Sequence, residues 1–179
     1  VMLAGPVVGG KQTMYYQAVN KALPNDTEHD RKAYGDFYNQ MLNIASDPEI
    51  AKDVKTYTKN TYFNWKKQQP DATLKALIHG SDSIVVETMS SAFSDLKRPW
   101  WHFFLTYDLT KDLQNLKIPV FALNGEKDEQ VDPKANLTAI KKINPNFKTY
   151  EVPGVNHLFQ HCKICGSVQE YFALEETFD

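Results

Sequence analysis

Residues 119–157 read PVFALNGEKDEQVDPKANLTAIKKINPNFKTYEVPGVNH and carry the clearest structural pattern in the chain. The segment 119–124, PVFALN, is an almost continuous apolar run, which is typical of a buried strand. Asp132-Pro133 indicates a helix start, because Asp caps the first backbone N–H groups and Pro suits the first turn. The segment 147–152, FKTYEV, predicts a second strand, and the helix between them should bury one face, formed by Leu137, Ile140 and Ile143. Strand, helix and strand in this order predict a βαβ unit and therefore a parallel sheet.

The residues before this unit divide into a short strand and a long helical region. Residues 1–4, VMLA, predict a buried strand that leads into the glycine-containing loop 5–10. From about residue 12 to 95 the spacing of apolar side chains is helical, and one helix is indicated by five such residues at i, i+3, i+4, i+7 and i+8: Tyr34, Phe37, Tyr38, Met41 and Leu42.

Two further helices and one aromatic cluster are predicted within and after this region. Ser46, Pro48 and Glu49 match a capping box, so we expect a helix that begins there and runs to about Tyr57. Residues 72–78 predict a short helix that ends at Gly80. The residues after Pro99 form a dense apolar cluster that we interpret as packing: Trp100, Trp101, Phe103, Phe104 and Leu105.

Composition and charge exclude some classes of function. The 179 residues are 42% hydrophobic and 23% charged, which is typical of a folded, soluble domain. A formal net charge of -2 argues against nucleic acid as a partner, because that would require a basic face. No apolar run approaches the roughly 20 residues that a membrane-spanning helix needs. No cofactor or metal is expected, and the sequence indicates no cellular compartment.

The two predicted strands of the βαβ unit are each followed by a side chain with catalytic potential. Asp128 follows the first strand and His157 follows the second. Ligands of parallel sheets bind beyond the carboxyl ends of the strands, so we expect the two side chains to touch there. A carboxylate beside a His fixes the tautomer of the ring and stabilises the imidazolium, as a general base requires. The alternatives are that Asp128 only forms a turn and that His157 is a solvated loop residue.

Two other acids lie in the same turn and compete with Asp128 for this role. Asp132 is better explained as the helix cap before Pro133, and Glu126 lies nearer the end of the strand. Asp128 is therefore the first choice for the catalytic acid.

The segments NGEKDEQVDP and VPGVNHLFQH resemble the last third of α/β-hydrolase-fold esterases and acyl hydrolases. The resemblance implies an α/β fold in which the catalytic acid is Asp128 and the catalytic His is His157, in the family's chain order. Asn156 and Phe159 belong to the same N-H-x-F pattern. The family resemblance also implies three parts: residues 1–11 as a core strand and active-site loop, 12–98 as an inserted helical cap, and 99–179 as the C-terminal part of the core.

The nucleophile of this family is not found in the sequence. It lies in a G-x-S-x-G turn, and no such turn exists here, because Gly80-Ser81 and Gly166-Ser167 lack the rest of the pattern. Because Val1 is not an initiator Met, we expect the chain to be a fragment whose parent supplies the Ser. The resemblance then implies a small ester-type substrate for the parent, and we expect the chain alone to be inactive.

Three alternatives remain open at this point. The chain could be a hydrolase-like binding or interaction module without catalysis. It could also pair with itself or with a missing N-terminal half through the edge of its half sheet. Cys162 and Cys165 form one C-x-x-C beside His161, which could be a local disulfide, a redox pair or half of a zinc site. One such pair is weak evidence for metal, and we favour chance or a local staple.

Overall fold

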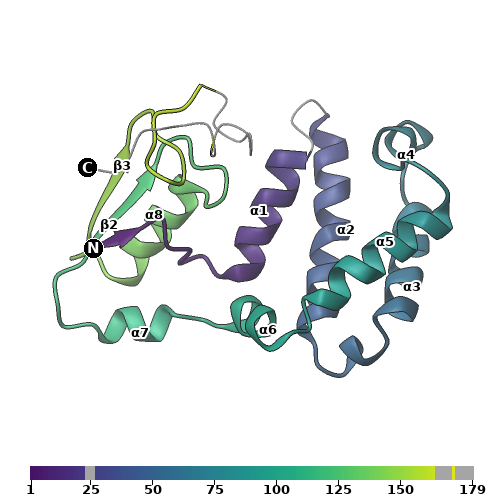
Figure 1. Ribbon diagram of the computed structural model, residues 1–179, viewed down its shortest axis with the longest axis horizontal. Coiled ribbons are helices and arrows are strands. Elements are labelled where there is room, and N and C mark those ends of the chain that lie inside the picture. Colours follow the sequence, from purple (N-terminus) through teal and green to yellow (C-terminus); the bar gives the residue numbers. More distant parts are fainter. Residues whose placement is uncertain (23–26, 164–170, 172–179) are drawn as a thin grey trace. The chain divides into compact units, whose positions relative to one another are not determined.

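The computed structural model describes residues 1–22, 27–163 and 171. Within this part, the protein is an α/β protein with eight α-helices, one short 3-10 helix and a small parallel sheet of three strands (Figure 1). The strands are β1 Met2–Leu3, β2 Phe121–Gly125 and β3 Lys148–Val152. The helices are α1 Gly10–Ala22, α2 Glu28–Ser46, η1 Ile50–Asp53, α3 Val54–Lys66, α4 Asp71–Leu77, α5 Asp82–Asp95, α6 Pro99–Thr106, α7 Thr110–Asn115 and α8 Pro133–Ile143.

The chain forms two compact units, each with its own core. An α/β unit contains residues 1–17 and 108–179, and a helical unit contains residues 18–107. The α/β unit is therefore discontinuous in sequence, since its first 17 residues are separated from the rest by the whole helical unit.

The sheet of the α/β unit has the order β1-β2-β3, with every pair parallel. Leu123 is paired with Leu3 on one side and with Tyr150 on the other, so β2 is the central strand. Helix α8 packs against β2 and β3, and Asp132 caps it by accepting hydrogen bonds from the backbone N–H groups of Lys134 and Ala135. The strand, helix and strand expected over 119–152 are confirmed. The core between sheet and helices is apolar: Val7, Leu113, Val120, Ala122, Leu137, Ile140 and Phe147.

The helical unit is organised around α2, α3 and α5, which contact one another pairwise (Figure 1). Phe37 and Met41 lie on the buried face of α2, as the spacing of apolar residues predicts. Phe37 packs against Tyr62 and Trp65 of α3, with ring centroids 6.2 Å and 5.2 Å apart. The Trp65 indole N–H donates to the Ala33 carbonyl at 2.8 Å, so this core also satisfies its buried polar group.

The helix expected to begin at Ser46 begins later and runs further. Ser46 is the last residue of α2, and its hydroxyl donates to the Asn43 carbonyl. Asp47 instead accepts from the backbone N–H groups of Glu49 and Ile50, which forms a turn before η1. The cap of α3 is Asp53, which accepts from the Thr56 N–H. Asp47 therefore satisfies the free N–H groups that the expected capping box assigned to Ser46.

The aromatic cluster after Pro99 is helix α6, and it is less buried than the packing interpretation implies. Leu105 is buried, whereas Trp100 is 62% exposed and Phe103 is 55% exposed. The exposed rings pack on their own neighbours along the helix: Trp100 stacks on Phe104 at 5.4 Å, and Phe103 stacks on Tyr107 at 4.5 Å. The cluster is therefore partly a surface of the helical unit.

Candidate active site

Asp128 and His157 lie together at the carboxyl edge of the sheet. Asp128 is in the turn that follows β2, and His157 is in the loop that follows β3. The His157 Nδ1 atom lies 2.9 Å from Asp128 Oδ2. Because β2 and β3 are parallel neighbours, their carboxyl ends deliver both side chains to one place. The contact expected from the sequence is present.

The Asp128 carboxylate is fully enclosed by hydrogen-bond donors. Its side chain is 0% exposed. Oδ1 accepts from the backbone N–H groups of Gln130 and Val131, at 2.8 Å and 2.9 Å. Oδ2 faces His157 Nδ1 and the Asn124 side-chain amide, which donates at 3.3 Å. The turn thus fixes one oxygen and leaves the other to orient the ring.

The His157 ring bridges this buried carboxylate and the surface, with 25% of its side chain exposed. For Nδ1 to donate to Asp128, the ring must carry its proton there, and Nε2 is then left as an acceptor. Within the described residues, no hydrogen bond of Nε2 is observed. This is the arrangement in which an imidazole can take a proton from a third group.

The loop that carries His157 is held by Asn156 and Phe159. Asn156 is 1% exposed, and its Oδ1 accepts from the Leu158 and Gln160 N–H groups at 2.9 Å and 3.1 Å. Phe159 has a positive φ of 58°, and its buried ring packs with Ala4 and Val155. The tight backbone of the loop is therefore fixed by one buried amide and one anchored ring on either side of His157.

The two competing acids have other partners. Asp132 is the cap of α8. Glu126 Oε2 accepts from the Gly154 N–H at 2.9 Å, which links the ends of β2 and β3. This bond lowers the pKa of Glu126, and Lys127 lowers it further. Neither carboxylate is paired with His157 in the structure.

Several residues that hold the acid turn were not singled out from the sequence. The Tyr16 hydroxyl donates to the Asp128 carbonyl at 3.1 Å, and the Gln17 amide donates to the Gln130 carbonyl at 3.0 Å. Burial raises the pKa of the Tyr171 hydroxyl, and the charge of Asp128 acts in the same direction. The only feature of the sequence that could have indicated these contacts is that Tyr16 and Gln17 follow the loop after the first strand.

Of the serines and cysteines considered in the sequence, two have other roles and two lie outside the described residues. Ser81 caps α5 by accepting from the Ile84 N–H, so it is a helix cap in the helical unit. Cys162 is disulfide-bonded, whereas Cys165 and Ser167 lie outside the described residues. Among the described residues, no group of three or more His, Cys, Asp or Glu side chains could hold a metal ion.

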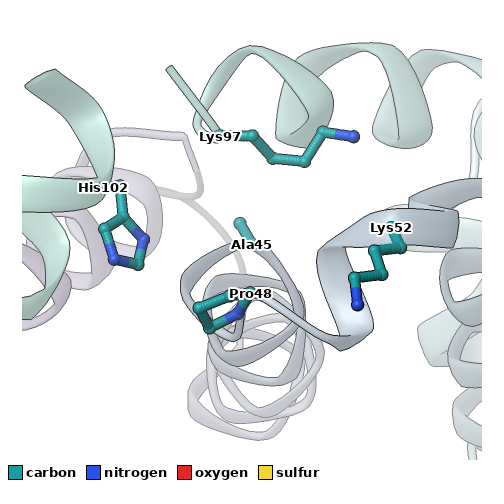
Figure 2. Close-up of a pocket in the computed structure, with 5 residues that line it drawn as sticks. All are labelled: Ala45, Pro48, Lys52, Lys97 and His102. Carbon is teal, nitrogen blue, oxygen red and sulfur yellow. The ribbon is translucent and has the colours of Figure 1, made fainter. Parts of the chain in front are cut away.

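Two pockets lie in the helical unit, and neither contains Asp128 or His157. One, of about 470 Å³, is lined by two lysines and a histidine together with two apolar residues (Figure 2): Ala45, Pro48, Lys52, Lys97 and His102. The other, of about 440 Å³, is lined by Lys55, Lys59, Phe63, Asp82, Ser83, Val86 and Glu87. Neither lining pairs a carboxylate with a histidine.

Comparison of the chain with family models, curated proteins and solved structures found no match. No helix among the described residues is both long enough and apolar enough to span a bilayer.

Proposed function

We propose that this chain is the C-terminal part of an α/β-hydrolase-fold serine hydrolase that acts on carboxylic ester-type bonds. The observation that carries the proposal is the 2.9 Å contact between His157 Nδ1 and a fully buried Asp128 carboxylate beyond the ends of parallel strands. Two features support it further. The acid precedes the His along the chain, and each follows its own strand of a βαβ unit, as the family resemblance requires.

In the proposed reaction, a Ser outside this chain attacks the carbonyl carbon of the ester. His157 Nε2 accepts the hydroxyl proton of the Ser and returns it to the leaving alcohol, while Asp128 holds the ring with Nδ1 protonated. Water then attacks the acyl-enzyme with its proton taken by Nε2, and that proton passes to the Ser oxygen as the carboxylic acid leaves. The oxyanion donors would also come from outside this chain. By the family resemblance, residues 12–98 would be the inserted helical cap.

This chain alone would therefore turn over no ester. Without a nucleophile there is no acyl-enzyme, and the loss of one oxyanion donor alone costs about 100- to 1000-fold in rate. A chain that lacks both should leave ester hydrolysis at the background rate.

The test is made on the full coding sequence that contains this chain. We expect a strand followed by G-x-S-x-G upstream of Val1, and we expect the full-length protein to hydrolyse a short-chain aryl ester. His157→Ala should remove most of this activity. His79→Ala is the matched control, because His79 is exposed in the helical unit and should leave the rate unchanged.

Two results would contradict the proposal. A coding sequence with no nucleophile turn would favour the non-catalytic binding module. Full hydrolysis by the His157→Ala protein would remove His157 from the mechanism.

A further inference from the structure

Two buried asparagines connect Asp128 to the turn that follows β1. Asn136, on α8, is 0% exposed, and Asn124, in β2, is 1% exposed. The Asn136 amide N–H groups donate to the Gly5 carbonyl at 2.9 Å and to Asn124 Oδ1 at 3.0 Å. Asn124 Nδ2 in turn donates to Asp128 Oδ2. A continuous chain of hydrogen bonds therefore runs from Gly5 to His157.

The orientation of both amides in this series of hydrogen bonds is set by the contact between Asn136 and Val7. Asn136 Oδ1 accepts from the Val7 N–H at 2.6 Å, so its NH₂ group must face Gly5 and Asn124. Asn124 then has to turn its oxygen toward Asn136 and its NH₂ group toward Asp128. If either amide were flipped, two like groups would face each other in a buried site, at a cost of about 1–3 kcal/mol for each unsatisfied group.

The consequence for Asp128 is that both of its oxygens are fixed. Backbone N–H groups of its own turn hold Oδ1, and Asn124 is the only side chain besides His157 that donates to Oδ2 within the described residues. Without Asn124, Oδ2 keeps the His157 contact alone. The bond between Asp128 and His157 then loses the partner that fixes its direction.

We propose that Asn124 and Asn136 are positioning residues that aim Asp128 Oδ2 at His157 Nδ1. They act through Asp128, and neither side chain is hydrogen-bonded to His157. Their importance for catalysis rests on the proposed function, but the positioning itself is a property of this chain and is measurable without substrate.

The experiment measures the ¹⁵N chemical shifts of the His157 imidazole by NMR in this 179-residue chain. In the unsubstituted chain, the His157 shifts should report a ring protonated on Nδ1. In Asn124→Leu, which has a similar volume but no donor, we expect the shifts to move toward a mixture with the Nε2-protonated form. Asn136→Leu should move them in the same direction by less, although Asn136 contacts neither Asp128 nor His157.

A double variant and a control separate positioning from fold stability. If the two asparagines act in series, the Asn124→Leu/Asn136→Leu chain should show the shifts of Asn124→Leu alone. Ile140→Val is the control, because Ile140 lies on the same helix as Asn136 but in the apolar core. It should lower the free energy of unfolding and leave the His157 shifts unchanged. If either leucine variant unfolds, the alanine variant of the same residue replaces it.

The proposal is overturned if folded Asn124 variants keep the His157 shifts of the original chain. It is also overturned if Asn136 variants alter only the unfolding midpoint, as Ile140→Val does. Failure of the proposed function would look different, because the shifts would respond as expected while the full-length protein hydrolysed no ester. In an active full-length protein, Asn124→Leu should lower kcat by up to about 100-fold with little change in KM.

Discussion

Gly125 lies directly beneath the backbone of the His157 loop, so that a Cβ atom on Gly125 would be 2.4 Å from the Asn156 carbonyl oxygen. The Val155 carbonyl oxygen would be equally close. The two residues that follow β2 also bond to the end of β3 and to this loop, since the Glu126 and Lys127 N–H groups donate to the Val152 and Val155 carbonyls. The end of β2 therefore sets where the loop can pass.

Gly125→Ala should displace the His157 loop from Asp128. The added methyl group meets backbone atoms, which cannot rotate away as a side chain would, so we expect about 1–3 kcal/mol lower free energy of unfolding in urea. The His157 ¹⁵N shifts should also change. Gly5→Ala is the matched control, because its Cβ would meet only the flexible end of Met2, at 3.9 Å. Equal stability of the two variants would show that the loop is not held this closely.

Asn156→Ala should loosen the His157 loop without unfolding the sheet. The substitution leaves the Leu158 and Gln160 N–H groups without their acceptor, at about 1 kcal/mol for each lost hydrogen bond. Amide hydrogen exchange at these two residues should become faster. Asn144→Ala removes a similar bond to Asn146 in another turn, and it should leave exchange in the His157 loop unchanged.

Asp128→Asn should be far more damaging to the full-length protein than Glu126→Gln. An amide at position 128 no longer selects the ring protonated on Nδ1, and such a change in a catalytic acid lowers kcat by about 10,000-fold. Glu126→Gln keeps an oxygen that can accept from the Gly154 N–H, so near-original kcat is expected. If a steady-state assay showed a larger loss of kcat in Glu126→Gln than in Asp128→Asn, Glu126 would be the catalytic acid.

The helical unit should lose stability in acid through Asp82. Lys66, at 2.5 Å, and then Tyr62, at 2.6 Å, lower the pKa of Asp82 below its ordinary value of 3.8. The unfolded chain therefore binds the proton first, so the stabilisation is present above the ordinary value and is lost as pH falls through the lowered pKa. Asp82→Asn should flatten this dependence, and Tyr62→Phe should weaken it.

Tryptophan fluorescence can follow this transition, because all three tryptophans lie in the helical unit: Trp65, Trp100 and Trp101. Unfolding midpoints measured below about pH 5 should differ less between pH values in the Asp82→Asn protein than in the original. An unchanged pH dependence would mean that other carboxylates determine the acid sensitivity of this unit.

The βαβ unit could be predicted because its signals agree with one another. The apolar run at 119–124, the Asp132 cap and the buried face of α8 all lead to one parallel arrangement. Once the strands are parallel, the meeting of Asp128 and His157 needs no knowledge of packing, since both follow strand ends. The division into residues 1–11, 12–98 and 99–179 was drawn from the family resemblance, and it remains a prediction beside the two compact units.

What could not be predicted depends on contacts between segments that are distant in sequence. Asn124 and Asn136 look like an ordinary strand end and an ordinary helix position, and their role requires Gly5 and Val7 as partners. The helix start expected at Ser46 was wrong because Ser46 and Asp47 can both accept from the N–H groups that follow, and in the structure Asp47 does so. Short helices such as α7 carry too few residues for their periodicity to be recognised.

The discontinuity of the α/β unit has a consequence for the order in which the protein folds. As the chain leaves the ribosome, residues 18–107 are complete before the first residue of β2 is made. The helical unit can thus fold during synthesis, while the pairing of β1 with β2 has to wait until Phe121–Gly125 is made. The bond between Val7 and Asn136 closes a separation of 129 residues, so we expect the pairing of β1 with β2 to be among the last events in the folding of this unit.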